Sequence, residues 1–290
     1  MVEYNKSMKI GFIGQGWIGK NYANDFEARN FAVVRYALEE PYIENKDKIG
    51  ECDIVFIAVP TPTTEKGFDD SIVRKAIKNV GKGKVAVIKS TILPGTTESI
   101  QKENPDIFVM HSPEFLTETT AAYDAAHPNR NIIGIPVEND LYRSKAQMVI
   151  DVLPDAPYVR IMSANDAEFV KYAGNCFLFT KIIFMNLLHD LVASTGGDWK
   201  SIRDALIHDP RIGSSHTEPA HKTGRGAGGH CFIKDFEAFR KMYDEKVSDT
   251  LGTRVFEAMK DKNIQLLVDS GKDIDLVEGV YGKAVNKKSR

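Results

Sequence analysis

The sequence MKIGFIGQGWIG, residues 8–19, joins a short apolar strand to a glycine turn, and a helical run follows over residues 20–28. This is the G-x-G-x-x-G pattern between a strand and a helix. There Gly14 permits a tight turn, Gly16 lets a pyrophosphate approach the backbone, and Gly19 lets the helix pack close to the sheet. The helix N-terminus then offers N–H groups and a favourable dipole to phosphates. The stretch predicts a dinucleotide-binding fold, with these cofactor-binding residues: Gly14, Gly16, Trp17, Ile18 and Gly19.

Strand and helix patterns continue to alternate after this motif. The run from Asp53 to Val59 is almost continuously apolar, which is typical of a parallel strand buried on both faces. About fifteen residues separate the second and third strands, so any helix there must be short. The alternation predicts an α/β fold whose first domain, residues 1–161, is a Rossmann-like, doubly wound parallel sheet. The expected strands are 31–36, 53–59, 84–89, 107–110 and 131–135, and the expected helices are 72–80, 97–103 and 141–151.

Polar residues follow the ends of these strands, where ligands bind in α/β folds. Val59-Pro60-Thr61 ends the third strand and Thr91 follows the fourth. Glu114 and Glu118 follow the fifth strand, although a single glutamate there is more often a surface charge. These residues mark the ligand side of the predicted sheet.

The acidic residue that would hold the adenosine ribose is missing from its expected place. The second strand ends at Tyr36, and the next residue is Ala37. Glu39 is the nearest candidate, and it could equally be a solvated loop charge. NAD is favoured over NADP, although Arg35 leaves some room for a 2′-phosphate.

The second half, residues 162–290, predicts an all-α domain built on a long central helix. Ser163 resembles an N-cap with Asp166 three residues on, and no proline follows until after Ser194. Such a helix would be roughly 45 Å long, which suggests that two domains or two subunits share it. Lys171 and Asn175 lie on one face of it, as a functional pair or as an ordinary lysine and amide. Helices are also expected at 199–207 and 247–270, and a partly disordered polar tail at 273–290.

A glycine-rich segment, Gly224-Arg225-Gly226-Ala227-Gly228-Gly229-His230-Cys231, precedes an expected helix at 234–243. A helix start favours the thiolate form of a cysteine, and glycines would let a substrate approach the backbone. The alternative is a glycine loop with a buried structural cysteine. Cys52 and Cys176 are distant and no Cys-x-x-Cys occurs, which argues against a disulfide framework or a zinc site and favours a reduced, cytoplasmic protein.

The composition excludes several classes of partner. Hydrophobic residues make up 42% and charged residues 27% of the chain, as in soluble globular proteins, and the formal net charge is -2. This balance gives no reason to expect nucleic acid or a membrane as partner. No apolar run approaches transmembrane length, and the first seven residues lack the apolar core of a signal peptide.

Several separate blocks together resemble the UDP-glucose/GDP-mannose dehydrogenases. The segment from Gly228 to Asp235 is similar to the G-G-x-C-F-P-K-D signature of that family, with Ile233 in place of the proline. The match runs from about Met8 to about Lys272. Supporting blocks occur in the order of the family: 59–63, 89–91 with 94–96, 112–116, 168–175 and 209–213.

The resemblance implies oxidation of a nucleotide-sugar, with UDP-glucose to UDP-glucuronate as the first choice, using two NAD and serving polysaccharide biosynthesis. Cys231 would be the nucleophile that forms a thiohemiacetal and then a thioester. Lys171 and Asn175 would stabilise the oxyanion. Glu118 would be the base for thioester hydrolysis, and Thr91 and Asp235 would hold the catalytic water.

The same resemblance assigns binding roles and no metal. His230 falls at a variable position and is taken as incidental. The implied cofactor-binding residues are the glycine motif with Glu39, Val59, Pro60, Thr61, Thr91 and Glu118. The implied substrate-binding residues are Glu114, Phe115, Leu116, Lys171, Asn175, Arg211, Gly224, Gly228 and Cys231.

One departure from the family keeps other functions open. The family carries a third, C-terminal domain that completes the nucleotide-sugar site, and only 55 residues follow Asp235 here. One alternative is a two-domain dehydrogenase of the 3-hydroxyacid/6-phosphogluconate type, which would need neither Cys231 nor Glu118. Another is a non-catalytic nucleotide-binding protein. For the nucleotide-sugar dehydrogenase a homodimer through the long helix is expected.

Overall fold

The computed structural model describes residues 7–283. Within that range the chain divides into two compact units. Unit 1 contains the residues up to Thr61 together with Asp69–Lys171, and unit 2 contains Pro62–Phe68 and the residues from Tyr172 onward. The chain therefore passes from one unit to the other three times.

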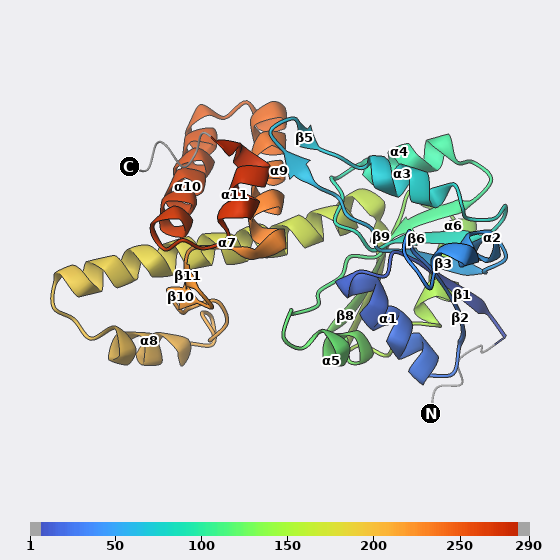
Figure 1. Cartoon of the computed structure of the whole chain (residues 1–290), viewed down its shortest axis with the longest axis horizontal. Helices are drawn as coiled ribbons and strands as arrows, with labels where there is room; N and C mark the ends of the chain where they lie inside the picture. The colour runs from blue at the N-terminus through green and yellow to red at the C-terminus, as the bar shows by residue number, and fades with distance from the viewer. Residues whose placement is uncertain (1–6, 284–290) are drawn as a thin grey trace. The chain divides into compact units, whose positions relative to one another are not determined.

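Unit 1 is built on a seven-stranded sheet with the strand order β2-β1-β3-β6-β7-β8-β9 (Figure 1). All neighbouring strands pair in parallel except β7 and β8, which are antiparallel. The predicted Rossmann-like α/β fold is therefore confirmed, with two reversed strands, β8 and β9, that the sequence did not indicate. The strands are β1 Lys9–Ile13, β2 Ala32–Tyr36, β3 Ile54–Ile57, β6 Val85–Ile88, β7 Phe108–His111, β8 Arg130–Ile135 and β9 Tyr158–Ser163.

Aromatic packing fixes the first helix on this sheet. Phe12 on β1 stacks on Phe56 of β3 with ring centroids 5.1 Å apart, and Phe26 of α1 contacts both rings. All three side chains are buried in one core cluster. Because these strands are buried on both faces, they read as continuous apolar runs in the sequence.

The helices of unit 1 agree with the sequence prediction except at one place. The crossover between β2 and β3 contains only one turn of 3-10 helix, Ile43–Asn45, and the four-residue α2, as its length required. The one exception is the helix α5, which was not predicted. The helices are α1 Trp17–Ala28, α2 Lys46–Ile49, α3 Ser71–Ile77, α4 Thr96–Glu103, α5 Ala121–Ala126 and α6 Asp140–Ile150.

The predicted long helix is α7, Ala164–Ser194, which starts in unit 1 and continues through unit 2. The Asp166 N–H donates to Ser163 Oγ at 3.1 Å, as the N-cap prediction requires. In unit 2 the Phe179 ring stacks on Phe236 of α9 with centroids 3.8 Å apart. This contact buries one face of the helix.

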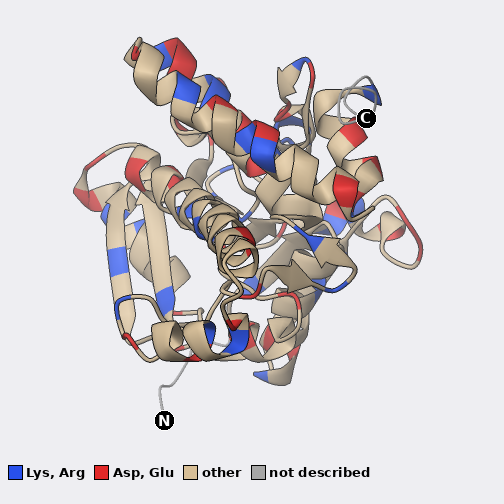
Figure 2. Cartoon of the chain, turned by 90° about the vertical axis from the view of Figure 1, so that its left-hand side faces the viewer, with Lys and Arg blue, Asp and Glu red and all other residues tan. Residues whose placement is uncertain are grey.

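The opposite face of α7 is apolar and exposed. Phe177, Phe184 and Leu191 follow one another at intervals of seven residues and are 68%, 58% and 61% exposed. Only five of the 31 residues of α7 are charged, and the helix is mostly neutral where it runs toward the viewer in Figure 2. By length and composition alone α7 could cross a membrane, although polar residues interrupt its apolar runs.

The helices α9 and α10 cover the buried face of α7, and α11 packs against α9 and α10 (Figure 1). Two short hairpins, one inserted at residues 63–68, complete the unit and were not predicted. The elements are α8 Trp199–Ile207, α9 Gly229–Val247, α10 Thr250–Asp269, α11 Ile274–Tyr281, β4 Thr63–Thr64, β5 Gly67–Phe68, β10 Ala220–His221 and β11 Gly224–Arg225.

Two predictions for this unit are wrong. The helix expected to begin at Lys234 begins at Gly229, so Cys231 lies inside its first turn. The tail expected to be partly disordered from residue 273 forms α11, because Val277 and Val280 are buried against Ile233 and Leu267. Residues 284–290 of that predicted tail lie outside the described part of the chain.

Candidate functional site

The glycine motif forms a cradle at the start of α1. A β-carbon at Gly14 would lie 2.2 Å from the Ala58 carbonyl oxygen, and one at Gly19 would lie 2.0 Å from the Gly14 carbonyl oxygen. A β-carbon at Gly16 would meet no atom within 4 Å. Gly16 is the N-cap of α1 and no side chain caps the helix there. The first amides of α1 therefore face open space, which fits an approaching pyrophosphate.

The two residues after Gly16 differ in their surroundings. Trp17 is 42% exposed at the first helical position, and Ile18 is partly buried against the core of unit 1. They can contribute their backbone N–H groups to a phosphate, because the first four amides of a helix have no intrahelical acceptor.

The guanidinium of Arg35 is already bound within unit 1. It donates to both carboxylate oxygens of Glu27, at 2.9 and 2.6 Å, and to the side chains of Asn24 and Gln15. These bonds occupy the donors that a 2′-phosphate would need. Glu39 is exposed beyond the end of β2.

The residues after β3 and β6 are hydrogen-bonded to each other. The Val59 N–H donates to Ser90 Oγ at 2.9 Å, and the same hydroxyl donates to the Val59 carbonyl at 2.7 Å. The buried Thr61 hydroxyl donates to the Thr91 carbonyl at 2.7 Å. Two predicted segments, 59–61 and 90–91, therefore form one rigid edge, with Pro60 exposed between them.

Glu114 and Lys171 form a buried ion pair. Lys171 Nζ donates to Glu114 Oε1 at 2.7 Å and to the Glu114 carbonyl at 2.8 Å, and the side chains are only 4% and 8% exposed. The second carboxylate oxygen accepts from the Leu116 N–H at 2.8 Å. The Arg130 guanidinium lies 3.7 Å from the centroid of the Phe115 ring. Glu114 thus fixes both Lys171 and the 114–116 turn.

Glu168 has a positioning role that the sequence did not suggest. Its fully buried carboxylate accepts from the Gly95 N–H at 2.6 Å, the Thr97 N–H at 2.8 Å and the Thr97 hydroxyl at 2.6 Å. Burial raises the pKa of Glu168 to about 7, while the bonds from Thr97 and Gly95 lower it. This carboxylate attaches the first turn of α7 to the start of α4.

Glu118 lies on an exposed turn before α5. The turn is held by Asp124, whose Oδ2 accepts from the Thr117 N–H at 2.8 Å and from the Thr120 hydroxyl at 2.9 Å. The sequence gave no signal for Asp124, because an Asx-type bond to a turn depends on how the turn folds. Glu118 is therefore accessible and held on a fixed turn.

In unit 2 the thiol of Cys231 is exposed in the first turn of α9. Asp235, one turn further along the helix, is fully buried. Its Oδ2 accepts from Asn175 Nδ2 at 2.6 Å, and its Oδ1 accepts from Lys234 Nζ at 2.5 Å. The structure therefore brings Asn175, Asp235 and Cys231 together on facing parts of α7 and α9.

The glycines before Cys231 face their own chain. A β-carbon at Gly224 would lie 2.4 Å from Ser270 Oγ, and one at Gly228 would lie 2.0 Å from Asp273 Oδ2. At these two positions the absence of a side chain is required by packing inside unit 2, whereas a β-carbon at Gly229 would meet no atom within 4 Å. Arg211 lies on an exposed loop, where its guanidinium binds Asp209.

A second buried polar group in unit 1 was not predicted. Lys89 Nζ donates to Ser112 Oγ at 3.1 Å and lies 4.3 Å from the centroid of the Tyr22 ring. Burial lowers the pKa of Lys89 to about 7 and, with help from Lys89, the pKa of His111 to about 3. Neither ring nitrogen of the buried His111 has a hydrogen-bond partner within residues 7–283.

Two family models match this chain. The model of the UDP-glucose/GDP-mannose dehydrogenase NAD binding domain matches residues 40–149, and that of the central domain of the same family matches residues 165–265. The chain belongs to the UDP-glucose/GDP-mannose dehydrogenase family. Its cofactor is NAD, and the open space at Gly16 with the uncapped start of α1 fits the pyrophosphate of that cofactor.

Two curated relatives carry the name UDP-glucose 6-dehydrogenase. The chain is 33% identical to "UDP-glucose 6-dehydrogenase" of Pseudomonas aeruginosa, over 77% of this chain and 51% of the relative. It is 32% identical to "Putative UDP-glucose 6-dehydrogenase YtcA" of Bacillus subtilis, over 78% of this chain and 54% of the relative. The chain thus spans about half the length of these curated relatives.

The structure of a UDP-glucose dehydrogenase from Pyrobaculum islandicum has a similar fold. It superimposes with a TM-score of 0.76 at 27% identity, covering 93% of this chain and 70% of that one. This similarity confirms the dehydrogenase fold of the family for both units.

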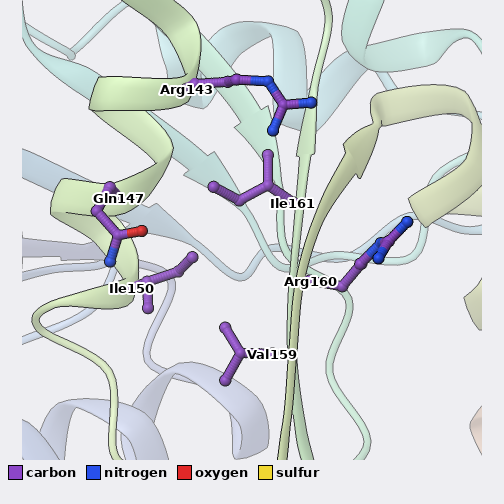
Figure 3. A pocket seen from close by; sticks show the side chains of 6 residues that line it. All are labelled: Arg143, Gln147, Ile150, Val159, Arg160 and Ile161. Atoms are coloured by element: carbon purple, nitrogen blue, oxygen red, sulfur yellow. The ribbon is translucent and has the colours of Figure 1, made fainter. Parts of the chain in front are cut away.

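A hollow of about 380 Å³ lies apart from these residues, between α6 and the edge strand β9 (Figure 3). Val159 and Ile161 point from β9 toward α6, whereas Arg160 points to the other side of the strand (Figure 3). The Arg143 guanidinium pairs with Glu138. Within residues 7–283 there is also no group of three or more histidine, cysteine or acidic residues that could hold a metal ion.

Proposed function

We propose that this chain is an NAD-dependent nucleotide-sugar dehydrogenase that oxidises UDP-glucose to UDP-glucuronate. The observation that carries the proposal is the exposed Cys231 thiol in the first turn of α9, one turn from the buried Asp235 that binds Asn175. A simple alcohol oxidation needs no such nucleophile. The names of the relatives support a UDP-sugar as the substrate.

The reaction is a four-electron oxidation in three stages. When bound at the glycine cradle of unit 1, NAD would supply the hydride acceptor for both oxidation stages. The alcohol carbon of the sugar first loses a hydride and a proton to give an aldehyde. The Cys231 thiolate then adds to that carbon, and loss of the second hydride leaves a thioester. Water finally adds to the thioester carbon, which releases the carboxylate and the thiolate.

The residues of both units have separate tasks in these stages. The α9 N-terminus favours the thiolate of Cys231, since its dipole stabilises a negative charge there. The Asn175 amide and the Lys171 ammonium supply hydrogen-bond donors for an oxyanion. Glu118 acts as the base that takes a proton from the hydrolytic water, and Thr91 and Asp235 orient that water.

Product stoichiometry tests this proposal. NADH formation is measured with UDP-glucose, UDP-N-acetylmannosamine, GDP-mannose and a small hydroxyacid, using wild type, Cys231→Ser and the matched control Cys52→Ala. Two NADH per UDP-glucose, lost in C231S and kept in C52A, supports the proposal. One NADH from a small hydroxyacid would indicate a two-domain dehydrogenase of another type, and NAD binding without any turnover would indicate a non-catalytic protein.

We also propose that the exposed apolar face of α7 pairs with the same face of a second copy. Apolar residues at intervals of seven suit helix–helix packing, because this spacing keeps one face toward the partner. Phe184→Asp places a charge at the centre of that face, and the exposed Leu38→Asp in unit 1 is the control. Light scattering after size exclusion should give a dimer for wild type and L38D and a monomer for F184D. A wild-type monomer would refute the pairing.

A further inference from the structure

We infer that four residues from α10 and the turn after it, Asn263, Ser270, Lys272 and Asp273, position the cysteine loop 224–231 for the reaction proposed above. We call these four residues the loop clamp. The expected effect on kcat rests on the proposed function. The expected effect on the path of the loop rests on the described contacts alone.

The backbone of the loop is held by three members of the clamp. The buried Asn263 amide pairs with Ala227 in both directions, accepting from its N–H at 2.7 Å and donating to its carbonyl at 3.0 Å. Ser270 Oγ accepts from the Arg225 N–H at 3.0 Å. Lys272 Nζ donates to the Gly226 carbonyl at 2.9 Å. A glycine-rich segment has few side chains of its own to fix its path, so these bonds determine it.

The fourth member, Asp273, caps the helix that carries the cysteine. Gly228 is the N-cap of α9 and has no side chain with which to accept from the first amides. Asp273 Oδ2 accepts from the Gly229 N–H at 2.7 Å, although the two residues are 44 apart in sequence. Asp273 is also the N-cap of α11, yet its side chain makes no capping bond to that helix. Its carboxylate therefore serves α9.

Lys272 is placed where packing alone would not put a lysine. It is only 4% exposed, and burial lowers its pKa while the neighbouring Asp273 raises it. A buried ammonium is costly unless its donors are used. Here the donors are used on the carbonyls of Gly224 and Gly226.

In this inference the clamp acts on catalysis through Cys231. Cys231 is two residues beyond Gly229, so any movement of the α9 start moves the thiol. A misplacement of about 1 Å can reduce a rate about a hundredfold. Asp273 is therefore a positioning residue for the nucleophile.

Three variants of the full chain test this role: Asp273→Ala, Asp273→Asn and Asp275→Ala. The asparagine oxygen can still accept from the Gly229 N–H, and the exposed Asp275 on the same helix is the matched control. We expect D273A to raise amide hydrogen exchange in the 224–231 peptide about tenfold, since a capping bond is lost. D273N and D275A should exchange like wild type.

The kinetic constants then distinguish a positioning role of Asp273 from a general loss of order in the chain. D273A should lower kcat about tenfold or more with UDP-glucose and leave KM for NAD unchanged, because the NAD cradle lies in unit 1. D273N should restore kcat. Unchanged exchange in D273A would overturn the inference, and so would raised exchange with an unchanged kcat.

A readout independent of turnover covers the other outcomes. The rate at which iodoacetamide labels Cys231, measured by mass spectrometry, should differ about fivefold between D273A and D275A. The reason is that the reactivity of a thiol depends on its surroundings. If wild type oxidises no nucleotide-sugar, the proposed function fails, and equal labelling would separately refute the clamp. If D273A does not fold, Lys272→Met removes the bond to Gly226 at similar volume and is judged by the same exchange and labelling criteria.

Discussion

Gly16 and Gly19 belong to one motif, but an added methyl group would meet different surroundings at each. At Gly16 a β-carbon meets nothing within 4 Å and the backbone φ is an ordinary -67°. At Gly19 it lies 2.0 Å from the Gly14 carbonyl oxygen and 3.1 Å from its carbonyl carbon. We therefore expect Gly16→Ala to impair NAD binding without unfolding unit 1, and Gly19→Ala to destabilise unit 1 itself.

The expected magnitudes differ accordingly. In G19A the methyl group must displace backbone, and overpacking of this kind costs about 1–3 kcal/mol. For a unit of this size each kcal/mol lowers the melting temperature by about 2–4 °C. In G16A the loss of a glycine N-cap costs at most about 1 kcal/mol. The added methyl group would occupy the place of the pyrophosphate and should weaken NAD binding at least about tenfold, or 1.4 kcal/mol.

The tryptophans offer a direct assay. Trp17 is exposed beside Gly16, and the only other tryptophan, Trp199, lies in unit 2. In a Trp199→Phe background, quenching of Trp17 fluorescence reports NAD binding, and circular dichroism reports melting without NAD. The reasoning is refuted if G16A binds NAD like wild type, or if G19A melts at the wild-type temperature.

Three further predictions concern buried charges in unit 1. Because the pKa of Lys89 falls from 10.5 to about 7, wild-type stability should rise between those pH values, and in Lys89→Met this rise in melting temperature should vanish. Lys171→Met leaves the Glu114 carboxylate buried without its cation. It should lower the free energy of unfolding in urea by about 3–5 kcal/mol. The double variant Lys171→Met with Glu114→Gln should recover most of the lost free energy of unfolding, and no recovery would contradict the pairing. Glu168→Ala leaves the Gly95 and Thr97 amides unpaired and should cost about 3 kcal/mol in thermal unfolding, Glu168→Gln less. Equal losses in the two would argue against the hydrogen bonds.

The first part of the fold could be predicted because its signals are local. The strand, turn and helix at residues 8–28 are adjacent in sequence, and the buried strands show as apolar runs. The directions of β8 and β9 have no such signal, since a strand has the same pattern in either direction. The long helix α7 could be predicted from its length without proline and its cap at Ser163.

The candidate site depends on contacts that sequence patterns do not report. The start of α9 was placed too late because Gly228 and Gly229 are poor helix formers, and the cap comes from Asp273, 44 residues away. The pairing of Lys171 with Glu114 joins residues 57 apart. Both residues were chosen as site residues, yet their ion pair could only be found in the structure.

The hairpin at residues 62–68 makes unit 2 dependent on a segment from the first quarter of the chain. Lys241 of α9 donates to the carbonyls of Thr64 and Glu65 at 3.4 and 3.2 Å, and α11 also contacts β4. During synthesis the hairpin leaves the ribosome long before α9 and α11 exist to receive it. Unit 2 therefore cannot close until its last helices have been translated. A fragment that starts at Tyr172 would lack the hairpin that contacts α9 and α11 and should aggregate, whereas adding a peptide of the hairpin should improve its solubility.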